Sequence, residues 1–104
     1  MNTQYDIEVN YANTKKVCSE IDEAAAKLDQ QKESYSTCRS NIAKVWKGKN
    51  ANSYLMKMQC IEEQMGSVSK TLKNISQTIN TYAENVRSAE LNAIELANAR
   101  IYNK

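Results

Sequence analysis

The stretch Val45-Trp46-Lys47-Gly48-Lys49-Asn50-Ala51-Asn52-Ser53-Tyr54 lies at the middle of a chain of 104 residues. It is the only stretch in which a glycine and helix-capping residues coincide. Gly48 can take the positive φ that ends a helix, and Asn50 can cap the start of the next one. The rest of the chain holds a single further glycine, Gly66, and no proline. Because so few helix breakers remain, we expect a long helix on each side of this stretch.

Before the stretch, apolar residues recur mostly at alternating steps of three and four. They are Ile7, Tyr11, Cys18, Ile21, Ala25, Leu28, Tyr35 and Ile42. This spacing is typical of a helix that packs lengthwise on another helix. One position earlier in the same register lie Val17, Ala24, Cys38 and Val45. They make the stripe about three positions wide per heptad, as in a helix bundle, so we expect these four residues to pack against a second subunit.

After the stretch, the apolar steps of three and four continue without a gap. The residues are Met58, Ile61, Met65, Val68, Leu72, Ile75, Ile79, Tyr82, Val86, Ala89, Ala93 and Leu96. Gly66 falls inside this pattern, where one glycine costs only about 1 kcal/mol relative to alanine. We therefore expect an unbroken second helix that packs on the first through this stripe, with Gly66 either at a place of close packing or without a structural role.

The pattern predicts a single all-α domain over residues 1–104, an antiparallel two-helix hairpin with a W-x-G turn. We expect helix one at about 4–46, the turn at about 47–49 and helix two at about 50–98, with a capping box of Thr3 and Asp6 at the start. Beyond about Leu91 the second helix has no opposite helix, so the C-terminal tail should fray. A hairpin this small cannot cover its own core, which predicts dimerisation into a four-helix bundle.

The composition excludes several classes of function. The chain has no histidine, so it lacks the commonest general base and metal ligand, and we expect no enzyme activity, no cofactor and no metal site. Cys18, Cys38 and Cys60 are odd in number and form no CxxC pair, which predicts reduced structural thiols. No apolar run approaches the roughly 20 residues that span a bilayer, and the N-terminus does not look like a Sec signal peptide.

Trp46-Lys47-Gly48 at the midpoint, flanked by heptad-patterned helices and followed eight residues later by Tyr54, resembles the WXG family. These are small secreted helical hairpins, the early-secreted-antigen-like substrates of type VII secretion, and the resemblance covers the whole chain. It implies a protein that is made in the cytoplasm, leaves without a Sec signal peptide, pairs with itself or a related hairpin, and meets the type VII secretion ATPase. Trp46 would then pack across the hairpin end with Val45 and Tyr54 beside it. Asparagine richness points to a Gram-positive source, where such proteins serve virulence or interbacterial competition.

The family's export signal, Tyr-x-x-x-Asp/Glu near the end of helix two, is absent, because the fourth residue after Tyr82 is valine. A broader form, apolar-x-x-x-Asp/Glu-x-x-apolar-x-x-x-apolar, is met by Val86, Glu90, Ala93 and Ala97. These four residues are the candidate export signal. The alternative is that they are ordinary residues of the helix contact.

Other interpretations remain at this point. The protein could be a dedicated partner that packs on the N-terminal helices of a larger type VII toxin and completes its export signal. Basic residues near the turn would suit nucleic acid, but the net charge of only +2 disfavours a nucleic-acid module. Neither helix has the apolar face with basic flanks of a membrane-bound helix. Cys60 is the one candidate nucleophile, and no histidine is present to activate it.

Overall fold

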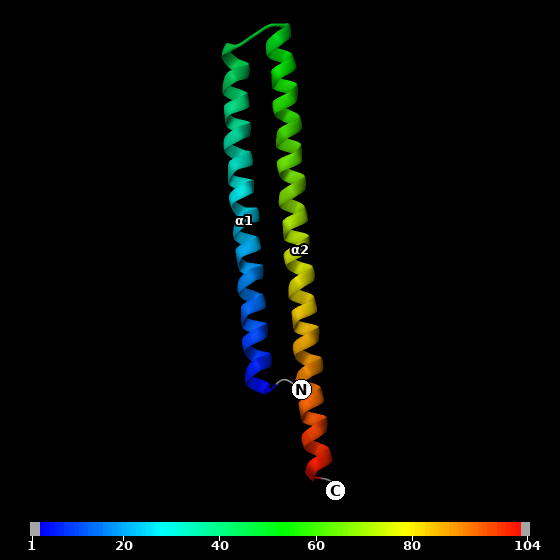
Figure 1. Cartoon of the computed structure of the whole chain (residues 1–104). Coiled ribbons are helices and arrows are strands. Elements are labelled where there is room, and N and C mark those ends of the chain that lie inside the picture. The colour runs from blue at the N-terminus through cyan, green and yellow to red at the C-terminus, as the bar shows by residue number, and fades with distance from the viewer. Residues whose placement is uncertain (1–2, 103–104) are drawn as a thin grey trace. The chain divides into compact units, whose positions relative to one another are not determined.

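The computed structural model describes residues 3–102, and these form two helices. Helix α1 covers Gln4–Val45 and helix α2 covers Lys49–Tyr102, with no strand among the described residues (Figure 1). α1 contains no glycine or proline, and α2 contains only Gly66. The scarcity of helix breakers thus accounts for the length of both elements. The predicted all-α hairpin is confirmed.

The residues group into two compact units, each made of one segment from each helix. Unit 1 comprises Met1–Glu20 and Ile75–Lys104, and unit 2 comprises Ile21–Asn74. In unit 1, Glu8 pairs with Arg87 while the later Lys15 pairs with the earlier Glu84, so the two segments run antiparallel. In unit 2, the pairs Asp29 with Lys73 and Arg39 with Glu62 give the same antiparallel order.

The start of α1 has the capping box that the sequence predicts. The Thr3 hydroxyl accepts a hydrogen bond from the Asp6 amide at 3.2 Å, and the Asp6 carboxylate accepts hydrogen bonds from the Thr3 amide and hydroxyl at 3.4 and 2.9 Å. Side-chain acceptors therefore satisfy amides of the first turn that have no partner within the helix.

The turn between the helices depends on Gly48. Its φ is +119°, a conformation that residues with a Cβ rarely adopt. The Gly48 carbonyl accepts the Asn52 amide at 3.0 Å, so Gly48 itself is the N-cap of α2. Asn50 lies within the first turn of α2, and the prediction that it caps this helix is wrong. α1 ends at Val45, one residue before the expected 46, and α2 extends past the expected 98 to Tyr102. The last two residues of the expected tail lie outside the described part of the chain.

The contact between the helices is built from small and polar residues. The buried residues of unit 1 are Ile7, Cys18, Ser76 and Ala83, and those of unit 2 are Ala25, Ala51, Glu62 and Ser69. The Ser76 hydroxyl donates to the Cys18 carbonyl at 3.2 Å, and the Ser69 hydroxyl donates to the Ala25 carbonyl at 3.3 Å. These hydrogen bonds from side chain to opposite backbone require the helices to approach closely, which small residues permit.

The predicted contact stripe of α2 is therefore only half right. Its row at Met58, Met65, Leu72, Ile79 and Val86 is half-buried, but the other row is exposed. The exposed residues are Ile61, Val68, Ile75, Tyr82, Ala89 and Leu96. The positions buried instead are Glu62, Ser69, Ser76 and Ala83, each one residue further along. One residue turns a helix by about 100°, so the row that the sequence assigned to the core lies on the flank of α2 beside the contact with α1.

Gly66 lies at a close approach, as predicted. The Nζ atom of Lys32 lies 2.9 Å from the position that a Cβ on Gly66 would take. The long aliphatic stem of Lys32 thus covers the backbone of α2 at a point where a larger residue would displace it.

Candidate interaction surface

Two aromatic rings of unit 2, Trp46 and Tyr54, lie in contact at the turn, tilted against each other. The ring centroids of Trp46 and Tyr54 are 5.6 Å apart with an interplanar angle of 33°, and the Lys57 ammonium lies 5.4 Å from the Tyr54 centroid. Trp46 is 42% exposed and Tyr54 is 56% exposed, so the pair is half open to solvent. Val45 is 84% exposed and does not pack beside the tryptophan as the sequence suggested, because the last turn of α1 points it outward. The rings close the hairpin end and still present apolar surface.

Four residues of α1 predicted to meet a partner are all on the surface. Val17, Ala24, Cys38 and Val45 are exposed, and their steps of seven or fourteen put them on one line along α1. They are free of contacts that would bury them within the chain, so their predicted role as a partner interface stays open.

A longer apolar surface lies on α2. We call the α2 row the seven residues Tyr54, Ile61, Val68, Ile75, Tyr82, Ala89 and Leu96, which repeat at every seventh position. Their large members are exposed by between 43% (Ile75) and 71% (Tyr82). Three residues after each of the first six lies a second exposed line, the α2 rim. The rim consists of Lys57, Gln64, Thr71, Thr78, Asn85 and Asn92. The row and the rim together contain a single charged residue, Lys57.

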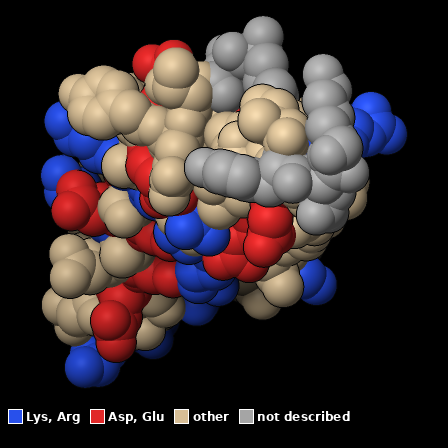
Figure 2. Space-filling model, turned by 90° about the horizontal axis from the view of Figure 1, so that it is seen from below, with Lys and Arg blue, Asp and Glu red and all other residues tan. Residues whose placement is uncertain are grey.

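The ion pairs of the hairpin lie on the opposite flank of α2. Lys73 and Arg87, which bond to Asp29 and Glu8 at 2.8 Å each, are fourteen residues apart and so share one line along the helix. A residue on this line is two positions from the α2 row, which at 100° per residue places it about 200° away. Figure 2 shows that acidic and basic side chains are interspersed on the face seen from below. The ion pairs Asp29–Lys73 and Glu8–Arg87 therefore lie away from the α2 row, and the row itself contains no charged residue.

Unit 2 contains an ion pair that is partly buried. The Nε of Arg39 lies 3.1 and 3.0 Å from the two carboxylate oxygens of Glu62, and the Glu62 side chain is only 8% exposed. Nearby, Asp29 accepts hydrogen bonds from Lys73 at 2.8 Å and from Ser69 at 2.6 Å. These two hydrogen bonds, that from Lys73 foremost, lower the pKa of Asp29 below its ordinary value.

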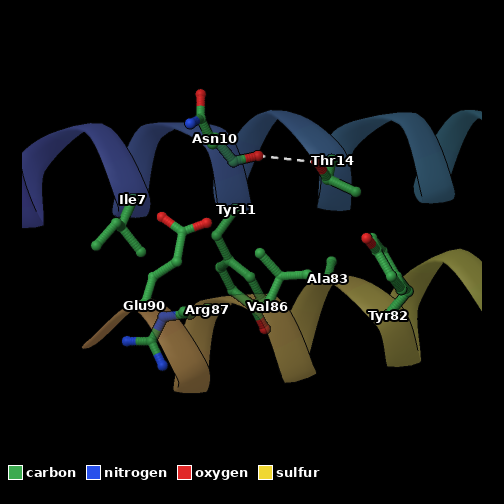
Figure 3. Close-up of a pocket in the computed structure, with 9 residues that line it drawn as sticks. All are labelled: Ile7, Asn10, Tyr11, Thr14, Tyr82, Ala83, Val86, Arg87 and Glu90. Atoms are coloured by element: carbon green, nitrogen blue, oxygen red, sulfur yellow. Dashed lines mark hydrogen bonds between the residues drawn. The ribbon is translucent and has the colours of Figure 1, made fainter. Parts of the chain in front are cut away.

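Unit 1 contains a half-open cavity of about 110 Å³ between the helices (Figure 3). Its lining residues are Ile7, Asn10, Tyr11, Thr14, Tyr82, Ala83, Val86, Arg87 and Glu90. Arg87 binds the Glu8 carboxylate, and its guanidinium lies 5.1 Å from the centroid of the Tyr11 ring. Figure 3 shows the Glu90 side chain pointing toward α1 near Ile7. The cavity is therefore an apolar recess with a fixed arginine at its edge.

A family model described as proteins of 100 residues with WXG matches residues 6–91. The chain belongs to the WXG100 family. The match includes the turn with Trp46 and Gly48 and all of the α2 row except Leu96. No curated protein and no solved structure matches the chain. Membership places it among small helical-hairpin proteins associated with type VII secretion, which are secreted without a signal peptide and are not known as enzymes.

The candidate export signal of this WXG100 protein is distributed between two environments. Val86 and Glu90 line the cavity and are half-buried, whereas Ala93 is exposed and Ala97 is half-buried further along α2. The four residues therefore do not form one exposed surface in the hairpin. Their role in export stays a prediction.

The thiols and acids of this WXG100 protein do not cluster. Cys18 is buried, while Cys38 and Cys60 are exposed. Within the described residues, no three His, Cys, Asp or Glu side chains lie close enough to hold a metal ion. None of the helices described is long and apolar enough to cross a membrane.

Sequence reasoning missed the α2 row as an outward surface. A signal was present, because Glu62, Ser69, Ser76 and Ala83 repeat every seven residues directly beside the apolar residues. Such a line of small and polar residues suits a close helix contact, and it competes with the apolar line for the place facing α1.

Proposed function

We propose that the protein is a non-enzymatic substrate of a type VII secretion system that is exported as a pair of helical hairpins. It is made in the cytoplasm and leaves the cell without a Sec signal peptide. The observation that carries this proposal is the α2 row in a chain of the WXG100 family. A protein that worked as a single hairpin would keep seven apolar positions in water along one helix.

The energetics support a partner. Burying a Val, Leu, Ile or Tyr side chain that was exposed gains about 1.5 to 3 kcal/mol, and the large members of the α2 row are about half exposed. The hairpin's own contact buries only small residues and Ile7 outside its polar groups. A partner that covers the α2 row, together with Val17, Ala24, Cys38 and Val45, supplies the apolar core that the hairpin lacks.

A second function is favoured by the cavity. Val86 and Glu90 are half-buried there, and the family's Tyr-x-x-x-Asp/Glu form is missing from the chain. A dedicated targeting partner, which packs on the N-terminal helices of a larger type VII toxin, would use the same apolar faces and would share the export signal of that toxin. In both functions the secretion ATPase is the receptor, and no nucleic acid or membrane insertion is involved.

The export experiment follows the tagged chain in its native host. We expect the protein in the culture medium of the wild-type strain and only inside cells of a strain that lacks the type VII ATPase, with a cytoplasmic protein as the control for lysis. Equal release from both strains would contradict the proposal. Deleting the gene of this chain separates the two functions, because a targeting partner is required for a toxin to reach the medium and an independent substrate is not.

A further inference from the structure

We propose that the half-open cavity of unit 1 is an anchor site for one phenylalanine side chain, carried by a partner protein of different sequence. This cavity of about 110 Å³ lies between α1 and α2 (Figure 3). The inference rests on the proposed function only for the existence of a partner. It adds a binding site within unit 1, the residue type that fills the site, and the requirement that this residue come from another protein.

The size of the cavity suits a single ring. Its volume of about 110 Å³ is on the scale of an engineered apolar cavity of about 150 Å³ that binds benzene. The most buried of its lining residues are Ile7 and Ala83, which are 3% and 8% exposed, and both are apolar. An occupant of one six-membered ring therefore gains dispersion contacts and loses apolar surface to water at the same time.

The cavity stays open because the long side chains at its edge are held by other contacts. The Arg87 guanidinium binds the Glu8 carboxylate at 2.8 Å and lies 5.1 Å from the centroid of the Tyr11 ring. The Lys15 ammonium lies 5.8 Å from the same centroid and pairs with Glu84 at 3.7 Å. Tyr11 thus has a cation from each helix beside it. The site is formed before an occupant arrives, which lowers the entropic cost of binding.

The polar groups of the lining are already in use. The Thr14 hydroxyl donates to the Asn10 carbonyl of its own helix at 2.9 Å, and Figure 3 shows the Asn10 amide group pointing away from α2. Arg87 is bound as described, and Glu90 takes part in an interaction within the chain. A tyrosine hydroxyl placed against the apolar walls would give up its hydrogen bonds to water without replacing them. A phenylalanine ring has no such group to lose.

The edge of the cavity favours a ring over an aliphatic side chain. It contains the rings of Tyr11 and Tyr82, which can meet a further ring edge to face, and the Arg87 guanidinium, which attracts the face of a ring. Tyr82 is 71% exposed, so its ring is accessible to an occupant. An aliphatic side chain of similar volume would gain only from the burial of its surface.

A second copy of this chain cannot supply the anchor. The chain contains six tyrosines, one tryptophan and no phenylalanine. Every ring that a second copy could bring therefore carries a hydroxyl or an indole N–H that needs a hydrogen-bond partner. The phenylalanine has to come from a different protein, so the site points to a partner that is not a second copy.

Titration of the purified full chain with toluene, the side-chain analogue of phenylalanine, tests the site. Methyl resonances report the position of binding. We expect saturable shifts at Ile7, Ala83 and Val86, which line the cavity, and none at Ala51, which is buried in unit 2. The tyrosine analogue p-cresol should bind at least about fivefold more weakly, because its hydroxyl is left unsatisfied. Methylcyclohexane, the aliphatic analogue, should also bind more weakly than toluene.

A matched pair of variants at Thr14 locates the bound ring. Thr14→Leu extends a side chain of the lining into the cavity and should abolish toluene binding. Thr14→Val keeps the shape of threonine and should bind toluene as the wild type does. Since the Thr14 hydroxyl bonds to its own helix, neither change removes a hydrogen bond between the helices. Circular dichroism verifies that both variants are helical, and the shifts of the wild type decide the test where Thr14→Leu does not fold.

Four results would overturn the inference. They are the absence of saturable shifts at Ile7 and Ala83, binding of p-cresol or methylcyclohexane as tight as that of toluene, and unchanged binding by Thr14→Leu. The fourth is a loss of toluene binding as the chain concentration rises, because a second copy would then fill the cavity. A chain that binds no toluene and is still exported through the ATPase loses only this site, whereas one that binds toluene and is not exported contradicts only the proposed function.

Discussion

Removing the Arg39 side chain should lower the free energy of unfolding by much more than the loss of a surface ion pair would. The Glu62 side chain is 8% exposed and its carboxylate contacts the Arg39 guanidinium at 3.0 Å, while the Arg39 side chain is 28% exposed. Arg39→Met leaves a buried carboxylate without its cation. Breaking a buried pair in this way costs about 3 to 5 kcal/mol, and the partial exposure of Arg39 places the expected loss near the lower value, about 3 kcal/mol.

The reverse change should cost less. In Glu62→Leu the guanidinium is left alone, but it can turn toward solvent, so we expect a loss of about 1 to 2 kcal/mol. The double variant replaces the pair by two apolar side chains of similar length and should lie within about 1 kcal/mol of the wild type. Lys73→Met is the control, because its ion pair with Asp29 is exposed to solvent and should contribute little to the free energy of unfolding.

Urea unfolding followed by far-ultraviolet circular dichroism measures these differences, at one fixed protein concentration because association also stabilises the fold. A loss of 3 kcal/mol corresponds to a fall in Tm of roughly 12 to 24 °C for a chain of this size. The reasoning is refuted if Arg39→Met costs no more than Lys73→Met, or if the double variant loses the sum of the two single losses.

Four further substitutions have defined outcomes. Gly66→Ala should raise the free energy of unfolding by about 0.5 kcal/mol, because alanine favours the helix and the end of the Lys32 side chain can move aside. Gly48→Ala should lower the free energy of unfolding by about 1 to 3 kcal/mol, because φ at this position is +119°. Thermal unfolding of both variants measures the two changes. Trp46→Ala should lower the free energy of unfolding by about 1 to 2 kcal/mol, which is less than for a buried tryptophan, because this residue is 42% exposed. If the variant still unfolds cooperatively, a loss of its export shows that Trp46 takes part in recognition. The pKa of Asp29 is lowered in the folded chain, so its carboxylate stabilises the fold above the ordinary aspartate pKa of about 3.9, and this stabilisation is lost as the pH falls below that value. In Asp29→Asn the free energy of unfolding should therefore fall less steeply with decreasing pH in this range. The same pH dependence in the variant and the wild type would contradict this prediction.

Heptad spacing was sufficient to predict two long helices, the glycine at position 48 predicted the reversal, and the short turn predicted the antiparallel order. It was not sufficient to say which apolar line each helix turns toward the other. Ile61, Val68 and Ile75 satisfy the same periodicity whether they pack on α1 or on another chain. The choice depends on backbone distance, which is set by small residues such as Ser69 and Ser76 that hydrogen-bond to the carbonyls of α1.

The candidate site was predictable to a similar degree. The ring contact of Trp46 with Tyr54 followed from their positions on either side of the turn. The half-burial of Val86 and Glu90 did not, because it arises from Ile7 and Tyr11 at the far end of the sequence. The spacing of residues along one helix does not show which residues of the other helix pack against it.

Sedimentation equilibrium of the purified chain tests most directly the claim that the α2 row is a partner surface. At tens of micromolar we predict a species of twice the 11.8 kDa chain mass, reduced to a single chain by Val68→Asp and unaffected by Lys70→Asp, which places the same charge on the opposite side of α2. A wild type that sediments as a single, fully helical chain, or a Lys70→Asp variant that dissociates as readily as Val68→Asp, would contradict the account.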